Sequence, residues 1–193
     1  AETTLRELKS EYRRVGRSFD LAGYAKQRGT VLDPYNYLSF LDQQGNLVAS
    51  SFAVAAPMNY RQFDGFQYQS RSGPQTPQPY LSVPYVAPTS GKLTMSLSIP
   101  LNQPDEAFGG MALIGIDPGY FSKLYAGFDL GQGSIVTLIG RDGIVRVRSS
   151  GAELSAAQDI SKSPLFTQLL PRQSAGSYVG PSPVDQVARV NSY

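Results

Sequence analysis

Cysteine, histidine and tryptophan are all missing from this chain of 193 residues. Without cysteine, the chain can form neither a disulfide framework nor a thiol nucleophile. Without histidine, it cannot build Ser-His-Asp or Cys-His catalysis, nor a histidine-ligated zinc or haem site. An enzyme would need a carboxylate or Ser-Lys mechanism, and the acidic residues are scattered on predicted turns. We therefore expect no catalytic residues, no metal site and no cofactor.

Long apolar runs and a strong charge of one sign are missing as well. The longest apolar runs, near residues 52–56 and 111–116, are far shorter than the roughly 20 residues that span a bilayer. If the protein is a membrane receptor, we expect its anchors to have been removed from this sequence. The formal net charge is only +2, so we expect no nucleic-acid partner. Arg13, Arg14 and Arg17 cluster on the first predicted helix, where a solvated face or a nearby membrane surface explains them better than a binding patch.

The composition that remains predicts a folded domain. Hydrophobic residues make up 41% of the chain and charged residues 17%, which argues against wholesale disorder. Residues 93–99 alternate between apolar and hydroxyl side chains, the two-residue period of a half-buried strand. Further strands are predicted for residues 111–116, 135–139 and 144–147, and Asp142-Gly143 between the last two predicts a hairpin turn.

Helices and irregular segments alternate with these strands. Residues 2–28 predict one long helix that stops at Gly29, because apolar residues recur every three or four positions. Residues 37–41 and 47–51 flank a five-residue loop and predict a hairpin. Residues 53–92 are irregular and rich in proline, and a loop of that length in a compact domain is usually functional or disordered. The aromatic side chains in this segment argue against disorder.

The last third of the chain is less regular. A polar stretch leads to a short predicted helix over residues 163–170, where Ser163-Pro164 makes a reasonable start. Residues 176–193 predict one or two strands. No internal repeat is otherwise evident.

Several short stretches stand in an order that is more specific than any one of them. They are Leu81-Ser82-Val83-Pro84, Thr94 to Pro100, Phe108-Gly109-Gly110, Gly115 to Phe121, Asp129-Leu130-Gly131, and Val136 to Ile139 with Arg141-Asp142-Gly143. Together they resemble the Cache family, the PAS-like extracytoplasmic sensor domains of bacterial histidine kinases, diguanylate cyclases and chemoreceptors. The resemblance covers residues 5–193 and is strongest from 80 to 148.

The resemblance implies an α+β fold built on a PAS-like antiparallel sheet. Residues 1–30 would be a long N-terminal helix that contributes to a homodimer contact. Residues 31–150 would form the membrane-distal sensor module. Residues 151–193 would be a connecting helix and the start of a truncated membrane-proximal module, or a tail that packs on the first domain.

In this family the ligand lies between the sheet and the segment equivalent to residues 53–92. The hydroxyls of 94, 96 and 98 would then line a pocket floor, or else face solvent. An aspartate near Asp117 holds the ammonium group in amino-acid sensors, although here it could equally form a turn or cap a helix. The family's arginine and tryptophan cluster is missing. The candidate ligand-binding residues are Tyr68, Tyr80, Ser82, Thr94, Ser96, Ser98, Asp117, Arg61 and Arg71.

The function implied is that of a periplasmic sensor in a membrane-anchored bacterial receptor. It would bind a small molecule of unknown class and signal to a cytoplasmic output domain, where any catalysis would lie. A diguanylate cyclase or phosphodiesterase output, acting through cyclic di-GMP, is favoured over a histidine kinase of a two-component system or a chemoreceptor. The alternative is a Cache-fold dimerisation or interaction domain without a ligand, which a pocket filled by tyrosine and phenylalanine would indicate.

Overall fold

The computed structural model describes residues 1–27, 35–51, 54, 56–72, 78–88, 90–126, 131, 133–150 and 153–193. The predicted helix end at Gly29, parts of the 53–92 segment, and Asp129-Leu130 lie outside these residues. The chain divides into two compact units, residues 1–120 and 121–193. This division lies near residue 120, whereas the sequence analysis placed a module boundary at residue 150.

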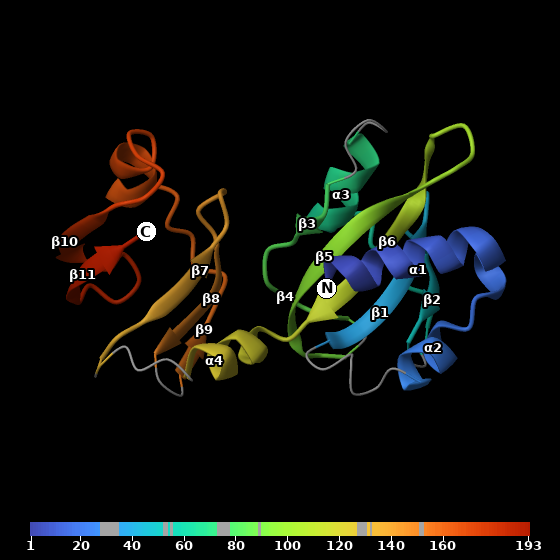
Figure 1. The fold of residues 1–193 in the computed structure, drawn as a ribbon, viewed down its shortest axis with the longest axis horizontal. Helices are drawn as coiled ribbons and strands as arrows, with labels where there is room; N and C mark the ends of the chain where they lie inside the picture. Colours follow the sequence, from blue (N-terminus) through green and yellow to red (C-terminus); the bar gives the residue numbers. More distant parts are fainter. Residues whose placement is uncertain are drawn as a thin grey trace. The chain divides into compact units, whose positions relative to one another are not determined.

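Unit 1 is built on an antiparallel sheet whose strands differ in length. The strand order is β2-β1-β6-β5-β3, and β4 also pairs with β5. Figure 1 shows these strands crossing the unit side by side. The strands are β1 (Tyr35–Asp42), β2 (Leu47–Ser50), β3 (Tyr80–Leu81), β4 (Tyr85–Val86), β5 (Leu93–Asn102) and β6 (Phe108–Ile116). The α+β class and the antiparallel sheet predicted from the sequence are thereby confirmed.

Helices cover both faces of this sheet. On one face, Leu5 and Leu8 of α1 (Glu2–Val15) are fully buried, and the Tyr12 ring lies 4.5 Å from the Phe40 ring of β1. On the other face lies α3 (Asp64–Arg71), whose Gly65 approaches the Ser98 hydroxyl of β5. Because successive strand residues point to opposite faces, β5 directs its apolar residues toward α1 and its hydroxyl residues toward α3. Both sides of β5 are therefore buried.

The single helix predicted over residues 2–28 is wrong. The structure instead contains α1, a 3₁₀ turn (Gly16–Ser18) and α2 (Leu21–Gln27). Gly16 adopts a φ of +67° and a ψ of −145°, a combination that essentially only glycine accepts without strain, and α1 ends there. The Asp20 carboxylate then accepts a hydrogen bond from the Gly23 amide at 2.8 Å, as an N-cap does at the start of α2.

Helix α3 was not predicted, since residues 53–92 were interpreted as irregular. It is eight residues long and is flanked by proline-rich sequence, which hides so short a periodic pattern. Its inner face is formed by Gly65, Phe66 and Gln69, all buried. Glycine has no side chain to mark a buried face, and glutamine is mostly exposed in proteins, so only Phe66 gives the buried face of α3 a hydrophobic signal.

Unit 2 holds two smaller sheets. One has the order β7-β8-β9 and the other pairs β10 with β11. The strands are β7 (Val136–Ile139), β8 (Val145–Ser150), β9 (Glu153–Ser155), β10 (Ser177–Pro181) and β11 (Ala188–Ser192). Helix α4 (Pro118–Ala126) precedes them, and the helix predicted over 163–170 is a π-helical turn (Leu165–Leu169). The predicted Asp142-Gly143 hairpin is confirmed, but it belongs to this separate sheet and not to the sheet of unit 1.

The first hairpin of unit 1 has a structural counterpart in unit 2, which the sequence analysis missed. In unit 1 the Tyr60 amide donates to the Gly45 carbonyl, and the Leu47 amide donates to the Met58 carbonyl. In unit 2 the Ile160 amide donates to the Gly143 carbonyl, and the Val145 amide donates to the Gln158 carbonyl. An isolated bridge, Asn46 to Asn59 in one unit and Ile144 to Asp159 in the other, completes the match. The paired backbone pattern persists although the side chains differ, so sequence comparison alone does not reveal it.

Candidate functional site

The hydroxyl side chains predicted to line the pocket do come together, but they are closed off from solvent. Thr94, Ser96 and Ser98 on β5 are 0%, 5% and 0% exposed. Ser82, in residues 80–86 (the crossing segment), is also fully buried. The Ser82 hydroxyl accepts a hydrogen bond from the Ser96 amide at 2.8 Å and donates to the Val83 carbonyl at 2.8 Å. The Thr94 hydroxyl donates to the Lys92 carbonyl at 3.1 Å. The Ser82 hydroxyl, and the Ser98 hydroxyl that donates to the Tyr80 carbonyl at 3.4 Å, therefore fasten residues 80–82 to β5, whereas the Thr94 bond is local.

Asp64, which the sequence analysis did not identify, holds α3 against the same crossing segment. One oxygen of its carboxylate, Oδ2, accepts hydrogen bonds from the Tyr80 hydroxyl at 3.1 Å and the Val83 amide at 2.8 Å. The other, Oδ1, accepts from the Gly65 amide at 2.8 Å. An acidic residue in the first turn of a helix also interacts favourably with the helix dipole. From the sequence, only this preference for an acidic residue at the start of a helix could have pointed to Asp64.

Gln69 is a second anchor that the sequence analysis missed. Its side chain is fully buried between α3 and β5, where Nε2 donates to the Ser98 carbonyl at 3.0 Å and the Gln78 carbonyl at 3.1 Å. Its Oε1 has no hydrogen-bond partner. A buried amide oxygen without a donor costs about 1–3 kcal/mol. The hydrogen bonds of Nε2 therefore fix α3 on the sheet, while the Oε1 of the same side chain is left without a hydrogen bond.

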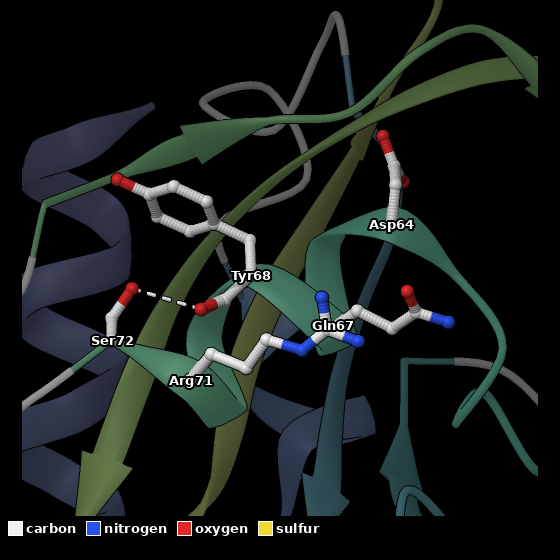
Figure 2. Close-up of a pocket in the computed structure, with 5 residues that line it drawn as sticks. All are labelled: Asp64, Gln67, Tyr68, Arg71 and Ser72. Atoms are coloured by element: carbon white, nitrogen blue, oxygen red, sulfur yellow. Dashed lines mark hydrogen bonds between the residues drawn. The ribbon is translucent and has the colours of Figure 1, made fainter.

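An open pocket lies on the outer side of α3, with a volume of about 370 Å³. Figure 2 shows its lining residues, Asp64, Gln67, Tyr68, Arg71 and Ser72, with the Ser72 hydroxyl donating to the Tyr68 carbonyl. The Tyr68 and Tyr80 rings stack 4.4 Å apart at an angle of 23°. Tyr68 is 40% exposed, so one face of this aromatic pair is available at the pocket.

The predicted arginines lie around the same helix. Arg71 lines this pocket and two neighbouring hollows of about 340 and 240 Å³, and Arg61 lines the smaller of them. Among the ion pairs of the described residues, neither guanidinium has a carboxylate partner. A guanidinium offers five N–H donors in a planar fork, which suits a carboxylate or phosphate. The outer side of α3 therefore combines an aromatic ring with unpaired positive charge.

Aromatic side chains fill the space between the sheet and the described part of residues 53–92 that covers it, which we call the covering segment. Tyr37, Tyr60 and Phe66 are buried there, and Phe63, Tyr85 and Phe108 pack against them. The Tyr37 and Tyr85 hydroxyls are hydrogen-bonded at 2.5 Å. Burial raises the pKa of both phenols, and for Tyr37 burial and the neighbouring Tyr85 raise it far above the usual value. Both rings are therefore neutral packing elements at any physiological pH.

Asp117 is separate from these residues. It follows β6, is exposed, and accepts a hydrogen bond from the Gly119 amide at 2.8 Å. Its carbonyl accepts from the Tyr120 amide at 3.1 Å at the start of α4. This geometry is that of a residue that caps a helix, which the sequence offered as the alternative to ligand binding by Asp117.

Within the described residues, no cluster of histidine, cysteine or acidic side chains could hold a metal ion. The helices that the structure describes include none with the length and apolar character of a membrane span.

Residues 118–193 match a family model named dCache_1_like and described as a histidine kinase sensor domain. No curated protein sequence matches the chain. Among solved structures, the extracellular domain of a proposed histidine kinase, rpHK1S-Z16, is 24% identical with a TM-score of 0.81, and the match covers 97% of this chain and 77% of that one.

Two ligand-bound chemoreceptor domains share the fold at lower similarity. One is the ligand-binding domain of the Pseudomonas aeruginosa PAO1 amino acid chemoreceptor PctB with L-arginine, at 16% identity and a TM-score of 0.57, covering 74% of this chain and 58% of that one. The other is that of the Pseudomonas fluorescens chemoreceptor CtaA with L-serine, at 12% identity and 0.56, covering 96% and 88%. At these identities the likeness establishes a shared fold. The predicted resemblance to Cache sensor domains is confirmed.

Proposed function

We propose that this chain is the extracytoplasmic sensor domain of a bacterial membrane receptor and binds a small molecule through unit 1. The observation that carries the proposal is the fold match over 97% of the chain to the extracellular domain of a proposed histidine kinase. The family-model match over residues 118–193 supports the same class of protein. The full-length receptor would be anchored in the inner membrane, with this domain in the periplasm.

The ligand would bind at the outer side of α3, in the pocket shown in Figure 2. The unpaired Arg71 guanidinium would pair with a carboxylate or another anionic group of the ligand, and the exposed face of Tyr68 would pack against its carbon skeleton. The amino acids named in the PctB and CtaA complexes carry such a carboxylate. The buried hydroxyls of β5 would support this site from beneath and would not contact the ligand.

Signalling would follow from movement of α3. Asp64 and Gln69 attach this helix to the crossing segment and to β5, and the unpartnered Gln69 oxygen makes the attachment less than fully satisfied. A ligand that prefers one position of α3 would shift the population toward it. The change would pass to the output through α1, where a homodimer contact is also proposed. Because the family model and rpHK1S-Z16 both name histidine kinases, we propose a kinase output in place of the diguanylate cyclase favoured by the sequence.

We further propose that unit 2 is the beginning of a second sensor module. The recurrence of the first hairpin's backbone pattern at Gly143 and Ile160 supports this assignment. On this proposal the second module starts near residue 121, earlier than the residues 151–193 expected from the sequence.

One observation favours the alternative, a Cache-fold interaction domain without a ligand. The space between the sheet and the covering segment is filled by the aromatic cluster around Tyr37 and Phe66, and the hydroxyls there bond to the chain itself. A sensor with its ligand in that layer would require these rings to move.

A thermal-shift screen of this domain against amino acids, amines, short organic acids and nucleobases separates the two functions. A ligand at a hundredfold excess over its dissociation constant adds about 2.7 kcal/mol to the stability of the folded state. We expect a carboxylate-bearing compound to raise the melting temperature, and Arg71→Ala to abolish the shift. Arg172→Ala, at an exposed arginine of unit 2, is the matched control and should preserve it. No shift across the panel would support the interaction domain, and equal loss in both variants would remove Arg71 from the site.

A further inference from the structure

A further hollow in unit 1 lies between α1 and the turn that joins β5 to β6, and no residue of α3 lines it. It has a volume of about 930 Å³. In Figure 1 α1 crosses in front of β5 and β6, and contacts between these elements confirm that they are neighbours. One wall is formed by Arg6, Lys9, Ser10 and Arg13 of α1, and the other includes Asn102 and Glu106. We refer to it as the α1 groove.

The α1 groove carries positive charge that the helix itself does not neutralise. Glu2 pairs with Arg6 at 2.7 Å, and Glu11 pairs with Arg14 at 2.6 Å. Glu7 accepts a hydrogen bond from the Tyr24 hydroxyl at 3.2 Å. Glu2 thus neutralises Arg6 of the groove, whereas Glu11 and Glu7 bond to residues outside the groove lining. Among the ion pairs of the described residues, none involves Lys9 or Arg13.

Lys9 occupies the most restricted position in this groove. It is half-buried, and Arg6 and Arg13 lie three and four residues away, on the same side of the helix. Burial lowers the pKa of Lys9, and the charges of Arg13 and Arg6 lower it further. Lys9 is therefore a partly desolvated cation beside two exposed guanidinium groups, of which Arg6 is paired with Glu2, and a bound anion would offset the repulsion that Lys9 experiences.

We propose that the α1 groove binds an oxyanion, a phosphate or carboxylate group, paired with Lys9 and Arg13. Ser10 on the helix and Asn102 on β5 supply neutral donors on the two walls. Glu106, on the turn, is the one carboxylate among the groove's lining residues in the described part of the chain and opposes the anion from one side. The volume is within the usual range for a small-molecule site. The same chemistry is carried by a soluble phosphorylated or polycarboxylate compound and by a phospholipid headgroup.

The test uses the domain as it stands, with inorganic phosphate and citrate as soluble probes and phosphatidylglycerol vesicles as the lipid probe. Binding of the soluble probes is measured by isothermal titration calorimetry at constant ionic strength, and vesicle binding by co-sedimentation. We expect at least one probe to bind, and the double variant K9Q/R13Q to weaken its binding by tenfold or more. Binding of phosphate or citrate would identify a soluble anion, whereas binding of vesicles alone would identify a headgroup.

Two further variants keep the result specific to the groove. K26Q/K92Q removes the same net charge at exposed lysines of unit 1 that do not line it, and should leave binding unchanged. Glu106→Gln removes the opposing carboxylate and should strengthen binding by about two- to fivefold, an effect that a purely structural role would not produce. Absence of binding to all three probes would overturn the proposal, as would equal loss in the two lysine-containing variants. Melting temperatures of the variants confirm that each one is folded.

Discussion

Single side chains decide how the covering segment is attached to the sheet, and Asp64 is the clearest case. Its two carboxylate oxygens accept three hydrogen bonds, from the Tyr80 hydroxyl and from the Val83 and Gly65 amides. We expect Asp64→Asn to lower the free energy of unfolding by about 1–3 kcal/mol, because an amide keeps one acceptor oxygen and places a donor against another donor. Urea denaturation followed by circular dichroism measures the difference.

Asp105→Asn is the matched control for that change. The Asp105 carboxylate accepts a hydrogen bond from the Ala107 amide at 3.1 Å, which an asparagine oxygen can also accept. We expect its effect to stay within about 0.5 kcal/mol. A similar small effect for Asp64→Asn would show that the attachment of α3 does not depend on the carboxylate.

At the scale of the element, close backbone approach fixes the β1–β2 hairpin onto the chain that follows it. Gly45 has a φ of +84°, and a Cβ there would lie 2.8 Å from the Arg61 amide nitrogen. Gly91 has a φ of +66°, but a Cβ there would meet nothing within 4 Å. We expect Gly91→Ala to cost about 1 kcal/mol for the left-handed conformation, and Gly45→Ala to cost roughly 1–3 kcal/mol more for the steric conflict.

Thermal unfolding of both glycine variants, monitored by circular dichroism, provides the comparison. Equal destabilisation would mean that conformation alone accounts for the glycine in the hairpin, and that the approach of residues 45 and 61 is not needed.

At the scale of the whole molecule, unit 2 should lose stability in acid. In unit 2, burial opposes ionisation of Asp142, but hydrogen bonds from Arg146 and the Ile144 amide outweigh it and hold its pKa below the usual value. The Arg189 hydrogen bond, with those of the Val187 amide and Arg148, lowers the pKa of Asp185. In the unfolded chain both carboxyls titrate near pH 4.

The direction of the acid effect follows from these pKa values. As the pH falls below about 4, the unfolded chain binds protons that the folded unit does not, so the stabilisation present at higher pH is lost. We expect the methyl resonances of Val145 and Val147, both fully buried, to report unfolding of unit 2 in an NMR titration from pH 7 to 2.5. Asp185→Asn should destabilise unit 2 at pH 7 and flatten the acid dependence, and an unchanged pH profile would contradict this account.

Much of the fold follows from local sequence patterns. The alternation along residues 93–99, the apolar run before Asp117 and the Asp142-Gly143 turn each predict an element that the structure contains. The break at Gly16 and Asp20 also has local signals, a glycine and an N-cap residue, which the longer apolar periodicity concealed. The lack of cysteine and histidine is visible in the composition alone, and it excludes disulfides, thiol nucleophiles and histidine-dependent catalysis in any fold.

The composition of the candidate site depends instead on contacts between distant residues. Tyr68, Tyr80 and Arg71 could be selected from the sequence, but Asp64 and Gln69 could not, because their partners lie between 9 and 29 positions away. Alternation showed that the hydroxyls of β5 share a face, and the packing of α3 buried that face. The sequence by itself determined which residues can share a strand or a turn, since that depends on neighbours in the chain. The tertiary structure decided which face is covered and by what, because that depends on where the chain crosses itself.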